Sequence, residues 1–283
     1  MYSSMTLFTR TVYCLALSLS TILGGCGTLL PTTDLGSDGG WPASGEDSFV
    51  ARSDDTFAAD AATSADGGTR VVDAAPAPFV FVPSSAAPTF VDDFARADGA
   101  VGNGWSVKGP GSFVIAGGSV LTMPSGVYDQ PILFREGAAG PDVEVSADMT
   151  FGSNITSWQY LFARVQPISD QPGKLWAYGL QVNAGSVSLM ILSSDGNVTG
   201  WGSLARESLE STLLVDTAYR LTLRVMGTDP VVVEGALSSA DGTLIRSVKG
   251  TDRGSYRIVS AGRVGLGWGL GDTKWDDFKL TNL

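Results

Sequence analysis

The feature that most constrains this chain is a strict two-residue alternation of apolar and polar side chains, repeated in several segments without a helical period. Residues 143–151 carry Val, Val, Ala, Met and Phe at every second position, with Glu, Ser, Asp and Thr between them. Residues 219–226 and 187–191 alternate in the same way. Because successive side chains of a β-strand point to opposite faces, each segment predicts a strand with one buried and one wet face.

Turn signals separate these segments, among them Gly117-Gly118 and Asp241-Gly242. About a dozen strands are expected between residues 89 and 283, which predicts an all-β, two-sheet antiparallel sandwich. A domain of this length buries roughly 70% of the surface that its unfolded chain exposes, so it needs no disulfide. The only two cysteines, Cys14 and Cys26, both precede it.

The N-terminus has the pattern of a secretory signal. Arg10 is its only charge, an apolar run covers residues 11–23, and small residues precede a cysteine. The run Leu23-Gly24-Gly25-Cys26 resembles the bacterial lipobox, in which a signal peptidase cuts before the cysteine and the thiol receives a diacylglycerol. We therefore expect residues 1–25 to be removed and Cys26 to anchor the protein to a membrane through acyl chains such as palmitate. The alternatives are a plain secretory signal or a membrane span, although the run is short for a span of about 20 residues.

Residues 26–88 form the next segment, dominated by Ala, Asp, Ser, Thr, Gly and Pro. Such a composition lacks the apolar content that offsets chain entropy, so we expect a disordered linker. As a flexible coil it would reach roughly 45 Å, enough to hold a domain clear of the bilayer. The alternative is a structural role for Trp41, Phe49 or residues 79–82, the last as an extra edge strand.

Charge and composition exclude several classes of function. The net charge is -11, and no cluster of Lys and Arg is present to neutralise phosphates, so nucleic acid is not an expected partner. Histidine is absent. The commonest general base and the commonest metal ligand are therefore missing.

Several motifs follow one another in a family order. They are Phe90-Val91-Asp92-Asp93-Phe94, Gly104-Trp105, Leu161-Phe162-Ala163-Arg164-Val165, Gly262-Arg263-Val264-Gly265-Leu266 and Trp275-Asp276-Asp277-Phe278. This order resembles the concanavalin A-like (laminin G-like) jelly rolls of bacterial secreted proteins, including those close to the 3-keto-disaccharide hydrolase domains. The resemblance covers residues 89–283. It implies the fold but not the function, because the group spans lectins, binding modules and enzymes.

No catalytic residue is predicted. The glucanases of this fold carry Glu-x-Asp-x-x-Glu or Glu-x-Asp-x-Glu on one strand, and neither pattern occurs here. The nearest candidates, Glu144 and Asp148, would lie roughly 13 Å apart on one strand face. This distance exceeds the separation of the two carboxyl groups that glycoside hydrolysis uses. We therefore expect both residues to belong to a solvated strand face. The alginate lyase-like branch relies on His with Tyr, which a chain without His cannot match.

Twin Asp-Asp-Phe motifs stand near the two ends of the domain, at Asp92, Asp93, Asp276 and Asp277. If the terminal strands pair, the four carboxylates could come together and hold a structural calcium ion. The alternative is structural, with the two phenylalanines that follow as core residues of adjacent strands.

Aromatic and amide side chains give the candidate ligand site. Trp158 and Tyr160 share a strand parity with Arg164, opposite to small aliphatic residues, and Gln181 could extend the same surface. An open sheet face of this kind would stack a sugar ring on an aromatic side chain and bond its hydroxyls. The alternative places the aromatic rings in the core and Arg164 in a buried ion pair.

The expected function is a tethered, extracytoplasmic lipoprotein at the outer membrane or cell surface, whose non-catalytic β-sandwich binds a polysaccharide or other glycan, or mediates adhesion. A glycoside-active enzyme related to the keto-disaccharide hydrolases and a structural envelope lipoprotein are the alternatives.

Overall fold

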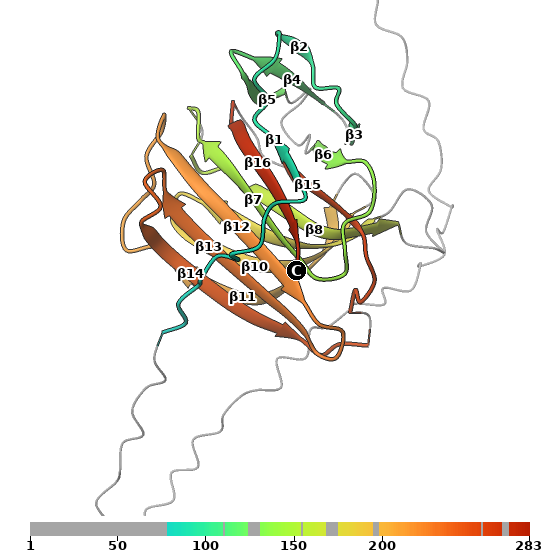
Figure 1. Cartoon of the computed structure of the whole chain (residues 1–283). Coiled ribbons are helices and arrows are strands. Elements are labelled where there is room, and N and C mark those ends of the chain that lie inside the picture. Colours follow the sequence, from blue (N-terminus) through green and yellow to red (C-terminus); the bar gives the residue numbers. More distant parts are fainter. Residues whose placement is uncertain are drawn as a thin grey trace, which may run out of the picture. The chain divides into compact units, whose positions relative to one another are not determined.

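The computed structural model describes residues 78–109, 111–123, 131–153, 155–167, 175–194, 198–255, 257–267 and 272–283. The predictions on the signal peptide, Cys26 and the linker up to residue 77 lie outside these residues. The described chain forms sixteen strands in two antiparallel sheets that stack face to face (Figure 1). None of its segments is a helix with the length and apolar character needed to cross a membrane.

The first sheet has nine strands, and in spatial order these are β14 (Leu244–Asp252), β13 (Val231–Ser239), β12 (Ala218–Met226), β7 (Val143–Thr150), β16 (Lys274–Asn282), β5 (Ser119–Met123), β4 (Ser112–Ala116) and β2 (Gly99–Ala100), with β1 (Phe90–Asp92) paired to β16. The second has seven strands in the order β11 (Val198–Ser208), β10 (Ser186–Ser194), β9 (Leu175–Asn183), β8 (Gln159–Pro167), β15 (Arg263–Gly267), β6 (Ile132–Arg135) and β3 (Trp105–Lys108). The predicted two-sheet sandwich is confirmed.

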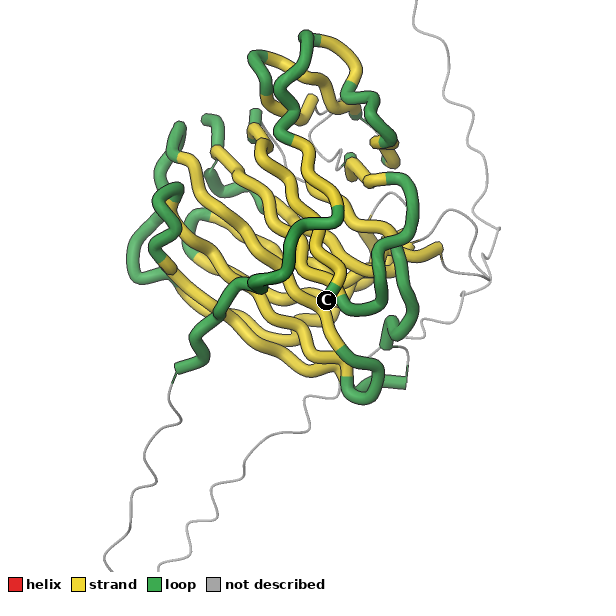
Figure 2. The backbone as a smooth tube through the Cα atoms, in the orientation of Figure 1, coloured by secondary structure: helices red, strands yellow, loops and turns green. Residues whose placement is uncertain are grey.

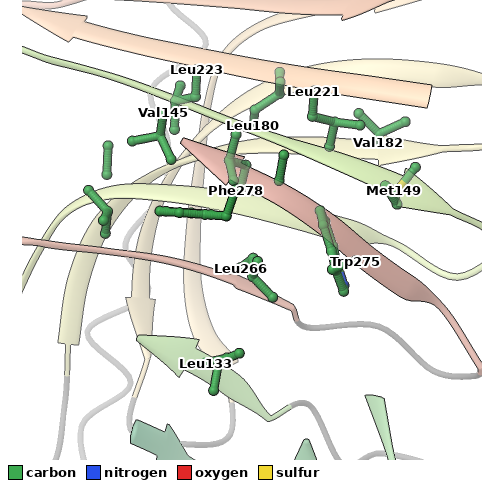
Figure 3. Packing of buried hydrophobic residues seen from close by; sticks show 14 of the residues in the cluster. Leu133, Val145, Met149, Leu180, Val182, Leu221, Leu223, Leu266, Trp275 and Phe278 are labelled. Atoms are coloured by element: carbon green, nitrogen blue, oxygen red, sulfur yellow. The ribbon is translucent and has the colours of Figure 1, made fainter. Parts of the chain in front are cut away.

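The main core lies between the two sheets and is made by the alternating residues of the sequence patterns. Val145 of β7 and Leu223 of β12 share one apolar cluster with Leu180 of β9, across the sandwich. Figure 3 shows Phe278 and Trp275 of β16 among these side chains. Fully burying an aliphatic side chain contributes about 1.5–3 kcal/mol, so this layer supplies the main stabilisation of a domain without cysteine.

The first strand closes the domain against the last. Phe278 of β16 packs edge-on against Trp105, with ring centroids 4.9 Å apart. The buried carboxylate of Asp92 accepts hydrogen bonds from Trp105 Nε1 at 2.8 Å and Arg96 Nη1 at 2.7 Å, and from the amide nitrogen of Phe94 at 2.9 Å. Burial alone would raise the pKa of Asp92, but these bonds outweigh it and hold the pKa below its ordinary value. Asp92 is thus a structural anion.

The outer face of the nine-stranded sheet is polar and carries a cross-strand ladder of alternating charge. Arg224 lies opposite Glu144 on one side and Glu234 on the other, and Glu234 lies opposite Lys249. Arg224 Nη2 is 2.5 Å from Glu144 Oε2, and Lys249 Nζ is 2.9 Å from Glu234 Oε1. Opposite charges on neighbouring strands stabilise such a face.

The two carboxylates considered as a catalytic dyad both belong to this face. Glu144 binds Arg224, and Asp148 binds Arg220 Nε at 2.8 Å. The expected solvated face is therefore a face of ion pairs, and Glu144 is only 9% exposed. Each carboxylate already has a cationic partner.

Residues 78–84, which we call the strap, lie across this ladder as an extended loop (Figure 2, and the teal segment of Figure 1). Phe81 is buried, with the Arg224 guanidinium 4.6 Å from its ring centroid. Arg224 Nη2 donates to the carbonyl of Val82 at 2.6 Å, and the amide of Ser84 donates to Glu144.

The strap corrects the predicted domain boundary. The packed domain begins before residue 89, because Phe81 docks on the ladder. Residues 79–82 were considered as an extra edge strand, but they cross the sheet face and form no strand. The physical reason is that Arg224 offers both a cationic surface for the ring and a donor for the backbone.

Arg164 joins the two sheets at one end of the sandwich. It lies at a β-bulge of β8 and is fully buried. Its guanidinium donates to the carbonyls of Pro141 at 2.5 Å, Ile258 at 2.6 Å and Gly227 at 2.9 Å, and to Asp142 Oδ1 at 3.2 Å. The acceptors precede β7, precede β15 and follow β12. One side chain of the seven-stranded sheet therefore binds the backbone next to β7 and β12 of the nine-stranded sheet and the segment that leads into β15 of its own sheet.

Replacement of Arg164 by alanine should destabilise the domain strongly, because four buried or partly buried acceptors lose their donor. We expect a loss of about 3 kcal/mol of unfolding free energy, which lowers the melting midpoint by roughly 6–12 °C. Thermal unfolding followed by circular dichroism measures it. The matched control is Arg253→Ala, which removes the same charge at an exposed position and should cost under about 0.5 kcal/mol. Equal midpoints for the two variants would contradict the structural role of Arg164.

Candidate functional site

The seven-stranded sheet is apolar on both faces. On the side turned away from the main core lies a second apolar cluster, which we call the outer cluster: Ile132, Phe134, Tyr160, Phe162, Val165, Leu175, Ala177 and Leu192, with Met190 packed against it. In β8 every residue from Gln159 to Val165 is buried. This layer forms the floor on which the candidate site stands.

Glycines make room for the aromatic rings of this layer. The rings of Tyr160 and Phe162 stack in parallel planes, with centroids 5.5 Å apart. Gly179 lies opposite Phe162, and a Cβ there would meet Leu192 at 2.7 Å. Gly265 lies on the other side of Phe162, and its Cβ would meet the Phe134 ring at 2.9 Å. A side chain at either glycine would therefore displace the floor.

A pocket of about 280 Å³ lies on this outer face, and we call it the Trp158 pocket. Its lining residues are Trp158, Gln181, Ser188, Met190, Ser203 and Arg206. Trp158 is 51% exposed, and it is the one exposed aromatic side chain among the residues whose burial the structure describes. An apolar ring beside amide, hydroxyl and guanidinium groups is the surface that a polar ring-shaped ligand requires.

Strand register, rather than loop geometry, sets the spacing of the polar groups. Gln181 of β9 lies opposite Ser188 of β10, and Ser188 lies opposite Arg206 of β11. Neighbouring strands are about 4.8 Å apart, so the three residues form a row of roughly 10 Å. Met190 and Ser203 are opposite each other in the next row. These groups are held by the sheet, so the site is largely preformed.

A short chain of hydrogen bonds connects Arg206 to Asn183 through Ser186. Its Nη2 donates to Ser186 Oγ at 3.3 Å. The Ser186 hydroxyl donates in turn to Asn183 Oδ1, which also accepts from the amide nitrogen of Gly185 at 2.9 Å. This bond orients the guanidinium toward Ser186, and Nε and Nη1 have no acceptor in the described part of the chain.

Two of the four predicted ligand residues, Trp158 and Gln181, meet in this pocket. Tyr160 does not line it. Tyr160 lies on the predicted outward face of β8, but its ring is fully buried in the outer cluster. The sequence did not reveal that an apolar cluster covers this face. Gln181 Nε2 donates to the Tyr160 hydroxyl, so Tyr160 supports the amide from below. Burial raises the pKa of Tyr160, and the hydroxyl stays protonated.

Arg164 is the second correction. It was placed on the open face because it shares the parity of Tyr160, yet the bulge between Ala163 and Gln166 breaks the alternation. The residue adopts a φ of 51°, and its side chain turns to the buried strand ends. Gly262 permits this bulge, because a Cβ there would lie 2.6 Å from the Arg164 carbonyl carbon. The alternative reading, a buried ion-pair member, is the correct one.

The four carboxylates considered for calcium do not converge. The terminal strands pair as expected, with Asp92 opposite Phe278, but Asp92 turns to Arg96 and Trp105. Asp277 binds Arg220 and Lys279, and Ser119 donates to Asp276. No group of three potential ligands stands together in the described segments. These residues therefore do not fit a calcium site, and Phe278 is a core residue.

Sequence reasoning missed Ser188, Met190, Ser203 and Arg206. The alternation of residues 187–191 already places Ser188 and Met190 on the outward face, so parity could have found both. Ser203 and Arg206 lie on opposite sides of a register shift in the pairing of β10 with β11. Only the folded register shows which side they take.

A second hollow of about 300 Å³ lies at the edge of the sandwich. It is lined by the start of the strap at Pro78 and Phe79, by Glu207 and by residues of β14. It adjoins residue 78, where the first described segment begins, and its walls include no exposed aromatic ring. The Trp158 pocket is therefore the better candidate site.

The fold is similar to that of solved proteins with low sequence identity to this chain. No family model matches the sequence, and no curated protein matches it significantly. A Bacillus subtilis protein of unknown function with a galectin-like fold superposes with a TM-score of 0.51 at 15% identity, over 69% of this chain and 96% of that chain. The carbohydrate-binding module CBM66 of Bacillus subtilis gives 0.43 at 14% identity, over 62% and 94%. SCLam, a non-specific endo-beta-1,3(4)-glucanase of family GH16, gives 0.47 at 10% identity, over 72% and 94%. The domain has the predicted concanavalin A-like jelly-roll fold.

Proposed function

We propose that the protein is an extracytoplasmic lipoprotein whose jelly-roll domain binds carbohydrate in the Trp158 pocket. The observation that carries the proposal is the position of Trp158. An indole half exposed to solvent costs free energy in water, and here it stands beside the amide of Gln181 and the hydroxyls of Ser188 and Ser203. A pyranose ring offers the matching surfaces, because its C–H face is apolar and its rim carries hydroxyls.

The charges around the pocket support binding rather than hydrolysis. None of its six lining residues carries a carboxyl group. Glycoside hydrolysis generally uses two carboxyl groups that flank the scissile bond. Glu144 and Asp148 lie on the other sheet and are engaged by arginines.

The strap supports a tethered display. It fixes the chain on the outer face of the nine-stranded sheet, whereas the Trp158 pocket lies on the outer face of the seven-stranded sheet. The first residues of the strap, Pro78 and Phe79, lie at the edge of the sandwich beside β14. In the proposed lipoprotein the tether from Cys26 therefore enters the domain at this edge and not through the Trp158 pocket.

Replacement of Trp158 by alanine should abolish most of the binding and leave the fold intact. The measurement is titration calorimetry with cello-, laminari-, manno- and xylo-oligosaccharides and with oligogalacturonate. Trp158→Ala should weaken the best ligand by tenfold or more, because a buried stacking ring dominates such sites. Its melting midpoint should change little, since the side chain is exposed in the free protein.

Two control variants make this experiment specific. Trp158→Phe keeps an aromatic face and should retain part of the affinity. Leu214→Ala removes an exposed apolar side chain, 63% accessible, that does not line the pocket, and it should bind as the wild type does. Full affinity in Trp158→Ala would contradict the proposed site.

The anchor is tested by Cys26→Ser. The acyl chains on Cys26 are the proposed membrane anchor, and each buried methylene contributes about 0.8 kcal/mol. The variant should move from the membrane fraction to the soluble fraction when cells are fractionated in high salt. A variant that still sediments with membranes would contradict the lipid anchor.

A further inference from the structure

We propose that the Trp158 pocket selects an anionic sugar, with Arg206 as the residue that binds its carboxylate. This inference rests on the proposed carbohydrate binding and adds the chemical class of the ligand. Arg206 is the single charged residue of the lining, in a protein with a net charge of -11.

Arg206 also differs from most arginines of the described domain. Arg164, Arg220 and Arg224 each bind a carboxylate. Arg206 has no carboxylate partner within the described segments, and its one hydrogen bond goes to the neutral hydroxyl of Ser186. Among the described residues, this cation therefore stands beside an aromatic ring with no carboxylate in ion-pair contact.

The chemistry of guanidinium favours a carboxylate here. Its planar donors bind two carboxylate oxygens at once, and such charge-assisted bonds are about twice as strong as neutral ones. Only one of the two N–H groups of Nη2 donates to Ser186, so the other can pair with an N–H of Nε or of Nη1 in a bond to both carboxylate oxygens. A neutral sugar would use Trp158, Gln181 and Ser188 equally well, so Arg206 is the group that separates acidic from neutral sugars.

The geometry fits a uronate in an oligosaccharide. Gln181, Ser188 and Arg206 form one cross-strand row, and Trp158 lines the same pocket. With a sugar ring on the indole, its hydroxyls reach the amide and the serine. The carboxylate of the same or the next residue then reaches Arg206, two strand spacings from Gln181, or roughly 10 Å.

The test uses the whole protein and two uronate probes, oligogalacturonate and oligomannuronate, each compared with its methyl ester. Esterification removes the charge and keeps the ring. We expect the better acid to bind at least tenfold more tightly than its ester, because a bond to a charged group contributes more than a neutral one. Higher salt should reduce this difference, since Arg206 is exposed.

Arg206→Gln should remove the preference by weakening the acid to the affinity of the ester, with the binding of the ester unchanged. Arg253→Gln is the matched control, because it removes one exposed charge that does not line the pocket, and it should keep the preference. Trp158→Ala should weaken both forms.

The outcomes separate this inference from the proposed function. Equal binding of acid and ester, or a preference that survives Arg206→Gln, would overturn the role of Arg206. Trp158-dependent binding of neutral oligosaccharides with no binding of either uronate would also overturn it, and the carbohydrate site would stand. If no member of either panel binds, both proposals fail.

Discussion

The domain depends on one buried guanidinium. Arg164 leaves β8 of the seven-stranded sheet and donates to backbone carbonyls next to β7, β12 and β15, so it closes one end of a sandwich that contains no cysteine. Each acceptor would otherwise be a polar group at a poorly solvated strand end, which costs more free energy than a single hydrogen bond supplies. The bulge that directs Arg164 inward also reverses the alternation of β8, so that Val165 joins the outer cluster. The same distortion therefore shapes both the core and the floor of the candidate site.

The site uses the unusual second face of this sheet. An outward face is normally polar, as the charge ladder of the nine-stranded sheet shows. Here aromatic rings lie beside Gly179 and Gly265 and leave a floor on which Gln181 and Ser188 stand in register. Trp158, in the loop before β8, and Arg206, on the edge strand β11, complete the pocket. Rigid strands position the polar groups, and the aromatic ring supplies an apolar surface for the ligand.

Much of this was predictable from the sequence. The two-residue alternation identified the strands, the core residues such as Val145 and the sandwich, because burial on one face enforces that period. The same rule correctly predicted that Tyr160 lies on the outward face of β8. It wrongly predicted that the ring is exposed, because the two-residue period does not show that a second apolar layer covers that face. It misplaced Arg164 because a bulge is invisible in an alternating pattern. Arg206 could not be assigned, because its position depends on a register shift that only pairing with β10 defines.

The most direct test of this account is to map the ligand on the domain by NMR. Backbone amide, indole and guanidinium N–H resonances are followed as the tightest-binding oligosaccharide is added. The account predicts that the largest shifts occur at the Trp158 indole, the Gln181 side-chain amide and Arg206 Nε, with the strap and the charge ladder of the nine-stranded sheet unaffected. Shifts that cluster on the ladder around Arg224, with none at Trp158, would contradict it.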